Sequence, residues 1–348
     1  MKHKALMVVL AAVTGAIAFG DAQAQAPLYK VTRSVLLGAP DRWDYVVYDA
    51  PSHRVYVAHG DRVTIVDGRD GRKVGEVLGF PGGTHGIGIS ARTGKGYTDD
   101  GAAGVAVAFD LKTFKAGKKI KAMEDADGIA FDDASGHIFV VNGDSKTVTA
   151  IDPATDKAIK TIDLGGGLEY AVSGGNGKLY VNGAENKELV RVDTRTNTVD
   201  AHWPIPGCTS PHGLAIDRES HRAFVSCVNK VMTVVDTDSG AVVATLPIGA
   251  GTDGAAFDPK RKRVFSSNGD GALSVIEERD PQTFVLLGTV ETAVTGRTMS
   301  IDPVSGRLFV AAADIDANAP IPPRPDGRPG RPKPLPGTLK LLFIDPVN

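Results

Sequence analysis

Short runs of alternating apolar and polar residues recur along this chain, and most of them end in an acidic residue. Seven such runs end at Asp67, Asp110, Asp152, Asp193, Asp236, Glu277 and Asp345. The successive spacings are 43, 42, 41, 43, 41 and 68 residues. Alternation of this kind is typical of half-buried strands, and a fixed period of this length is typical of a repeat architecture. The pattern therefore predicts a β-rich repeat.

A second series of positions keeps the same period. Its members are polar or charged, but they differ in chemistry from one unit to the next. They are Asp44, His85, Asp127, Glu169, His212, Asp253 and Arg297. Their spacings are 41, 42, 42, 43, 41 and 44 residues, so two independent markers define the same seven units.

Each unit is expected to form four short strands. In the third unit, the runs DGIAFD, HIFVVNG, TVTAID and IKTIDLG are separated by turn-forming segments rich in Asp, Ser, Pro and Lys. No segment shows a competing helical stripe of apolar residues. A single four-stranded sheet cannot bury both faces, whereas sheets stacked radially can. The sequence thus predicts an all-β, seven-bladed β-propeller of four-stranded antiparallel blades.

The two ends of the chain are expected to close this ring together. The seventh unit stops after Asp345 and lacks an outer strand, whereas residues 29–38 resemble the outer strand at residues 158–165. An N-terminal strand is therefore expected to complete blade 7. An open solenoid is the alternative, but it would leave strand edges unpaired.

The units resemble the YVTN-repeat family. The best copy is FVVNGDSKTVTAIDPATD at residues 139–156, and AFVSC at residues 223–227 with VVDTDSG at residues 234–240 forms a second. The resemblance extends over the chain after residue 24 and implies a secreted, seven-bladed propeller similar to YncE-like proteins. Propellers of similar architecture include binding proteins, lactonase-like hydrolases and accessory subunits of periplasmic dehydrogenases, so the resemblance implies a fold and not one activity.

Residues 1–24 have the layout of a secretory signal peptide. Lys2, His3 and Lys4 precede an apolar stretch at residues 5–20, and small residues follow before Ala24. The stretch is short for a membrane span, although an uncleaved anchor is the alternative. We expect residues 25–348 to form the exported propeller, periplasmic in location and without a membrane span.

The composition of the chain limits the classes of binding partner that are expected. The full chain has 39 Lys and Arg against 41 Asp and Glu, and removal of residues 1–24 leaves a net charge of −3. A nucleic-acid partner is therefore not expected, because such proteins usually carry a basic excess. The expected partner is a small molecule or a periplasmic protein. A hydrophobic content of 42% is enough for a folded core, so a disordered chain is not expected.

The funnel of the propeller is the candidate site. The loops before the first strand and after the second strand of each blade should open on the same face near the axis. They would carry two rings of side chains, the first being the seven-member series above. The second is His59, Asp100, Asn142, Gly183, Cys227, Asn268 and Ala312, with Asn182 beside Gly183. The alternative for each Asp or Asn is a turn-forming role through a bond to its own backbone.

The funnel residues suggest two kinds of chemistry. Imidazole and carboxylate groups together suit a divalent metal ion, and the proposed ligands are His59, His85, Asp100 and Asp127. No established metal-binding motif supports this set. Lactonase-like propellers hold a cation with Glu, Asn and Asp at the axis, which Glu169, Asn142, Asn268 and Asp253 resemble. If the protein is an enzyme, Glu169 or Asp127 is the candidate general base.

The two cysteines, Cys208 and Cys227, fall in one blade. In an exported protein, a disulfide that staples the WPIPGCTSPHG loop is the leading interpretation. A Cys-Cys-His cluster with His212 and a pair of free thiols are the alternatives.

The long step in blade 7 marks an insertion at about residues 319–337. It is rich in Pro and carries Arg324, Arg328, Arg331 and Lys333, a composition that favours extended polyproline II structure. Because it replaces the turn between the second and third strands, it should rise on the funnel face. A lid, a partner-docking strap and a disordered loop all remain open.

Two functions follow from these observations. The first is an exported propeller that binds a small molecule, metal or protein partner in its axial funnel, as an accessory to a periplasmic enzyme. The absence of a catalytic motif favours it. The alternative is a metal-dependent hydrolase or lactonase that uses the same funnel, in which the cation polarises a carbonyl group.

Overall fold

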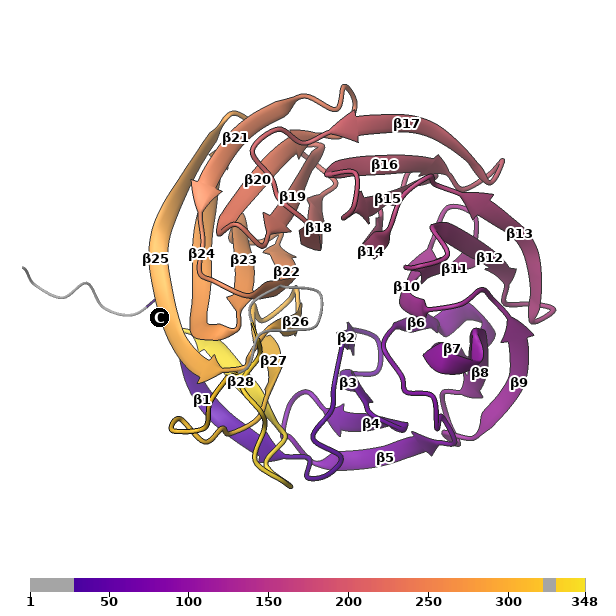
Figure 1. The fold of residues 1–348 in the computed structure, drawn as a ribbon, viewed down its shortest axis with the longest axis horizontal. Helices are drawn as coiled ribbons and strands as arrows, with labels where there is room; N and C mark the ends of the chain where they lie inside the picture. The colour runs from indigo at the N-terminus through magenta and orange to yellow at the C-terminus, as the bar shows by residue number, and fades with distance from the viewer. Residues whose placement is uncertain (1–27, 322–329, 348) are drawn as a thin grey trace, which may run out of the picture.

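Seven four-stranded sheets surround a common axis in the computed structural model, which describes residues 28–321 and 330–347 (Figure 1). Every pairing within the sheets is antiparallel. The predicted seven-bladed β-propeller is therefore confirmed. The expected signal peptide at residues 1–24 lies outside the described residues.

The first strand of each blade lies nearest the axis and the last strand forms the rim (Figure 1). Blade 1 contains β2 (Val46–Asp49), β3 (Arg54–His59), β4 (Arg62–Asp67) and β5 (Lys73–Leu78). Blade 2 contains β6 (Ile87–Ser90), β7 (Lys95–Asp100), β8 (Val105–Asp110) and β9 (Ala116–Lys121), with short 3₁₀ turns η1 (Ala91–Thr93) and η2 (Gly101–Ala103). Blade 3 contains β10 (Ala126–Asp132), β11 (His137–Asn142), β12 (Thr147–Asp152) and β13 (Lys157–Asp163). Blade 4 contains β14 (Leu168–Ser173), β15 (Lys178–Gly183), β16 (Glu188–Asp193) and β17 (Thr198–Pro204).

The remaining three blades follow the same order, except that the last one is built from both ends of the chain. Blade 5 contains β18 (Pro211–Asp217), β19 (Arg222–Cys227), β20 (Val231–Asp236) and β21 (Val242–Pro247). Blade 6 contains β22 (Thr252–Asp258), β23 (Arg263–Asn268), β24 (Asp270–Asp280) and β25 (Thr283–Val294). Blade 7 contains β26 (Thr298–Ile301), β27 (Leu308–Ala312), β28 (Lys340–Pro346) and β1 (Tyr29–Leu36).

The ring closes as the sequence predicts. Strand β1 pairs antiparallel with β28, from Tyr29 opposite Pro346 to Leu36 opposite Lys340. This pairing supplies the outer strand that the seventh unit lacks. The insertion likewise lies between β27 and β28, the predicted place.

Each space between neighbouring blades is filled by one apolar cluster. Between blades 3 and 4, for example, Phe139 and Val148 of one sheet pack with Leu179 and Val190 of the next. Seven such clusters occupy the seven interfaces in the described part of the chain. The alternating pattern follows from this arrangement, because each inner strand presents one face to each neighbouring blade.

In blades 1 to 5, the recurring acidic residue at the end of the third strand caps the turn that follows. The side chain of Asp110 accepts hydrogen bonds from the backbone N–H groups of Lys112 and Thr113 at 3.0 and 2.6 Å. Asp193 and Asp236 make equivalent bonds in blades 4 and 5. The first marker of the repeat is therefore an Asx-type turn and serves the fold.

In the described part of the chain, no helix has the length and apolar character that a membrane crossing requires.

Strand β1, which closes the ring by pairing with β28, should contribute strongly to the stability of the fold. Tyr29 is fully buried and its ring packs edge-on against Phe265 of blade 6 at 5.1 Å between centroids. We expect Tyr29→Ala to lower the free energy of unfolding by about 3–5 kcal/mol, as for other large buried aromatic residues. Urea denaturation measures the effect. Leu36→Ala is the control, because Leu36 lies in the same strand but is 70% exposed. Equal effects of the two substitutions would contradict the closure role.

Candidate functional site

The first predicted ring converges on the propeller axis. The structure places six of its seven members around one cavity of about 170 Å³, together with Tyr45 and with Arg331 from the insertion. The six are Asp44, Asp127, Glu169, His212, Asp253 and Arg297. They come together because each lies at or just before the first strand of a different blade, and these strands surround the axis (Figure 1).

Glycine at the next position allows the blades to approach this closely. A Cβ atom on Gly86 would lie 2.1 Å from the carbonyl oxygen of Asp127, and one on Gly213 would lie 2.6 Å from the backbone of Gly254. Both distances are shorter than carbon contacts permit. The Asp-Gly and His-Gly pairs of the ring are thus packing features of the axis and not turns.

Two blades carry tyrosine at this position instead. The rings of Tyr45 in blade 1 and Tyr170 in blade 4 contact each other at 4.6 Å between centroids. Two blades separate them on one side and three on the other, so the contact crosses the axis. Aromatic rings therefore fill the channel beside the acidic cavity.

One side of the cavity is rich in cations. The Nε atom of Arg297 lies 2.5 Å from Oδ2 of Asp253, and Nη2 of Arg331 lies 3.7 Å from the same oxygen. His212 donates from Nδ1 to the carbonyl oxygen of Ser210 at 3.0 Å. Its other nitrogen, Nε2, faces Glu169 at 3.4 Å and Asp253 at 4.0 Å. Asp253 is thus surrounded by positive groups.

The opposite side is acidic. Burial raises the pKa of Asp44 to about 6 despite the nearby Arg297, and burial raises the pKa of Glu169 to about 7 despite His212. Burial, followed by the charges of Asp44 and Glu169, raises the pKa of Asp127 well above its usual value. Three carboxyl groups of unlike strength therefore share one small space, where full ionisation is costly.

His85, the seventh ring member, lies next to this cavity and has its own partners. Its Nδ1 atom donates to Oδ2 of Asp99 at 2.7 Å, and Nη2 of Arg42 donates to its Nε2 at 3.0 Å. Burial opposes the charged ring, but the bond to Asp99 and the charges of Asp99 and Asp44 together outweigh it and raise the pKa of His85. The sequence analysis did not single out Asp99, although strand alternation in β7 places it on the other face from Asp100.

The second predicted ring does not line the cavity. His59, Asp100, Asn142, Asn182 and Asn268 are all buried inside the blades. Asn142, for example, donates to both Thr147 and Thr149 and accepts from the backbone N–H of Met123. Asn142 and Asn268 thus hold the loops at the ends of their own strands, which is the turn-forming alternative, whereas Asn182 bonds to the backbone of blade 5.

The four residues suggested as metal ligands are not brought together. Nδ1 of His59 contacts the hydroxyl of Thr64 at 2.8 Å, and its Nε2 donates to the carbonyl oxygen of Pro40 at 2.7 Å, so both nitrogens have structural partners. Oδ1 of Asp100 accepts from the backbone of Gly82. Within residues 28–321 and 330–347, no group of three or more His, Cys, Asp or Glu is placed to hold a metal ion.

A larger cavity of about 410 Å³ shares Arg297 and Arg331 with the axial one. Its wall contains Trp43, which is 5% exposed and whose indole nitrogen has no hydrogen-bond partner in the described residues. Arg297 lies over the indole ring at 5.5 Å. The other lining residues are Asp41, Arg42, Ala250, Gly251, Gly269, Asp270, Thr295, Gly330, Pro332 and Pro334. We call it the outer cavity, because the insertion forms one of its sides.

The described ends of the insertion are held firmly. Asp41 accepts backbone bonds from Thr338 and Leu339 at 2.9 and 3.0 Å, and Ile315 forms an antiparallel bridge with Pro334. Arg331 and Pro334 thereby reach the cavities, as the predicted position on the funnel face requires. Arg324 and Arg328 lie outside the described residues.

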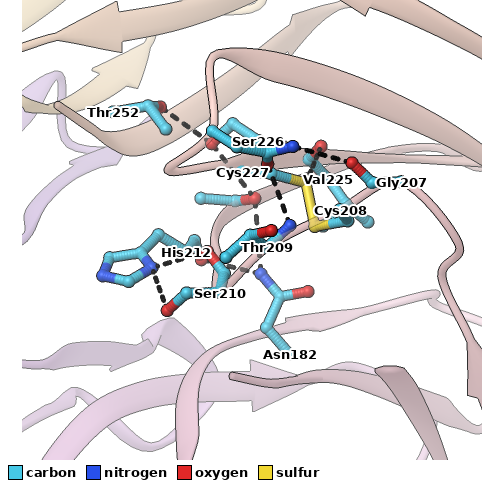
Figure 2. Close-up of a disulfide and its surroundings, with 12 residues drawn as sticks. Asn182, Gly207, Cys208, Thr209, Ser210, His212, Val225, Ser226, Cys227 and Thr252 are labelled. Atoms are coloured by element: carbon cyan, nitrogen blue, oxygen red, sulfur yellow. Dashed lines mark hydrogen bonds between the residues drawn. A yellow bond between two sulfur atoms is a disulfide. The ribbon is translucent and has the colours of Figure 1, made fainter. Parts of the chain in front are cut away.

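A disulfide joins Cys208 to Cys227 beneath the loop that carries His212, with Cα atoms 5.5 Å apart. Figure 2 shows the His212 ring turned away from the sulfur atoms and bonded to Ser210. Asn182 of blade 4 donates to the backbone oxygen of His212 at 2.7 Å and fixes the same loop from the other side. The alternative Cys-Cys-His cluster is thus not formed.

Comparison with known proteins supports the fold and names no activity. A family described as "Domain of unknown function (DUF5074)" matches residues 82–215, which is less than half of the chain. The chain is similar to a solved structure of the RRP9 WD40 repeats, with a TM-score of 0.75, 10% identity, and coverage of 91% of this chain and 97% of that one. It is equally similar to a structure of U3-55K, with a TM-score of 0.75, 10% identity, and coverage of 93% and 99%. No curated protein matches the chain.

The raised pKa of Asp127 has a consequence for stability. Its folded pKa exceeds that of the unfolded chain, so the folded state holds more protons and loses stability as the pH rises between the two values. We expect Asp127→Asn to stabilise the ligand-free protein by roughly 1–2 kcal/mol at pH 8 and by less at pH 5. Chemical denaturation at both pH values measures this.

Asp133→Asn is the matched control, because the substitution removes the same charge from a side chain that is 68% exposed and lines neither cavity. It should change stability by less than about 0.5 kcal/mol. Destabilisation by Asp127→Asn at pH 8 would mean that the carboxylate has a stabilising partner, contrary to the electrostatics described.

Proposed function

We propose that the mature chain is an exported periplasmic β-propeller that captures a small molecule in its axial and outer cavities. One observation carries this proposal. Six ring residues of unlike chemistry converge on one cavity, while carboxylates that serve the fold, such as Asp110 and Asp193, are bonded within their own turns. A cavity with a few convergent polar groups and perturbed pKa values is the usual signature of a ligand site.

Export is the second part of the proposal. It rests on the signal-peptide layout of residues 1–24, on the resemblance of the repeats to secreted YVTN-repeat, YncE-like proteins, and on the disulfide, which suits an oxidising compartment. A periplasmic enzyme that this protein serves would meet the bound molecule at the mouth beside the insertion.

The metal-dependent hydrolase remains the weaker candidate. Burial raises the pKa of Glu169 to about 7, which suits a general base near neutral pH. However, the described residues show no side-chain group arranged to hold a metal that would polarise a carbonyl. Binding needs only the cavities, so it is preferred.

Obstruction of the outer cavity should abolish capture. Ala250 lines this cavity and is only partly buried, so Ala250→Trp should fold and fill the space. A panel of cationic, neutral and anionic small molecules is screened by thermal shift, and hits are measured by calorimetry. We expect at least one hit whose affinity falls tenfold or more in Ala250→Trp.

Ala116→Trp is the control, because Ala116 is exposed on the rim strand β9. It should leave the affinity unchanged. Absence of any hit, or an equal effect of both substitutions, would refute capture in the cavities.

Export predicts the form of the protein in the cell. When the full chain is produced in a Gram-negative bacterium, the periplasmic fraction should contain a product that begins at Gln25 and has no thiol that reacts with an alkylating reagent. Intact mass spectrometry with and without reduction measures both. A product that retains residues 1–24, or that stays with the cytoplasm or the membrane, would contradict the proposal.

A further inference from the structure

The carboxyl groups on the acidic side of the axial cavity are partly buried, and they differ from the fully buried carboxylates of the protein in their partners. Asp132 is buried, but it accepts bonds from Ser135, Ser173 and Thr194. Asp258 is buried, but it accepts from the backbone of Lys260 and pairs with Arg261. Buried carboxylates generally require such donors.

Asp44 and Asp127 have no such donors. Neither side chain accepts a hydrogen bond from any described residue, and Oδ1 of Asp127 is a buried oxygen with no partner. Glu169 pairs with His212 at 3.4 Å. Three carboxyl groups thus border a cavity with almost none of the donors that would satisfy them inside the protein.

Tyr45 gives independent evidence at the same place. It lines the cavity, is only 8% exposed, and its hydroxyl makes no hydrogen bond with the described residues. Burial, followed by the charges of Asp127 and Glu169, raises its pKa well above the usual value, so the hydroxyl keeps its proton. A hydroxyl in the cavity wall that has no partner among the described residues can bond to a ligand that enters the cavity.

We infer that the axial cavity binds the protonated amino group of an organic amine, whose N–H groups donate to Asp44, Asp127 and Glu169. The apolar body of the amine lies in the outer cavity against Trp43. This inference rests on the proposed function and specifies the class of its ligand. A primary ammonium group has three donors and no acceptor, which matches three carboxylates that lack donors.

Two other ligand classes fit less well. A bare divalent cation needs oxygen ligands at about 2–2.6 Å on all sides, and no group of three acidic or imidazole side chains in the described residues is placed for that. An anion would face the three carboxylates. The nearby cations Arg297 and Arg331 both already contact Asp253.

Binding of an amine should depend on pH through the cavity. The charged and titratable groups that face it come from every blade except the second, and from the insertion. They are Asp44, Tyr45, Asp127, Glu169, His212, Asp253, Arg297 and Arg331. As the pH falls through 7 and 6, Glu169 and Asp44 take up protons and lose their charge. Simple amines stay protonated because their pKa lies near 10, so the loss of affinity reports on the protein.

Calorimetry with a series of primary amines, from butylamine to phenethylamine, tests the inference. Each amine is compared with the alcohol and the carboxylate of the same length, and with Ca²⁺ alone. At pH 8 we expect the best amine to bind at least tenfold more tightly than its alcohol, and its affinity to fall at least tenfold at pH 5.

Two substitutions locate the contact. Asp127→Asn should weaken amine binding at least tenfold, and Tyr45→Phe, which removes one oxygen and keeps the aromatic contact, should weaken it severalfold. Asp133→Asn makes the same charge change at an exposed position and should have no effect.

The results separate this inference from the proposed function. If only neutral or anionic compounds bind, and Ala250→Trp blocks them, capture stands and the amine assignment is wrong. If Ca²⁺ binds and no amine does, the assignment is also wrong. If no amine in the series binds, or if Asp127→Asn and Asp133→Asn act alike, the assignment is overturned. If nothing binds at all, both proposals fail.

Discussion

The structure depends on the burial of both faces of every blade against its two neighbours. In an open arrangement the two end blades would each leave one face in water, so the last of the seven apolar layers is formed only when the ring is complete. The seventh layer, between blades 7 and 1, combines residues from both ends of the chain, because β1 supplies the last strand of blade 7. Closure by β1 and β28 therefore completes the burial of the whole ring, and it fixes the seven inner strands around one axis.

This geometry fixes the backbone positions of the first residues of the inner strands. It does not fix which side chains they carry. The backbone must pass close to the neighbouring blade, which Gly86 and Gly213 permit. The side chain one position earlier then lines a shared cavity in every blade but the second, where His85 bonds to Asp99 instead. Carboxyl groups placed there repel one another in a poorly solvated site, so Asp127 and Glu169 hold their protons unusually tightly. Groups that lower stability in this way are typical of sites shaped for a ligand.

The fold and the first ring could be predicted from the sequence because both follow from one period. A residue that recurs every forty or so positions must occupy the same place in every blade, so Asp44 and His212 meet without any knowledge of loop geometry. The second ring obeys the same period, yet Asn142 and Asn268 are bonded within their own loops. The period alone cannot distinguish a residue that lines the cavity from one that holds a loop, because an Asn at a strand end gives the same sequence pattern in both roles. Two partners of the ring residues do not follow the period and could not be predicted from it. Asp99 bonds to His85 because strand alternation turns its side chain to that face of β7. Arg331 comes from an insertion that has no counterpart in the other blades.

The apolar layer between blades 7 and 1, where the ring closes, also forms part of the wall of the outer cavity. Trp43 belongs to the apolar layer between blades 7 and 1, where it packs with Leu339 and Leu341, and the same side chain lines the cavity. Arg297 lies over its ring and pairs with Asp253 on the far side, so it spans both cavities. A ligand that packs against Trp43 therefore contacts the apolar layer that closes the ring. A ligand that neutralises the axial carboxylates reduces their mutual repulsion at the propeller axis. Occupancy of the site and stability of the propeller are thus linked through the same side chains, and a ligand that binds only the folded ring must stabilise it by an amount that grows with the logarithm of its affinity.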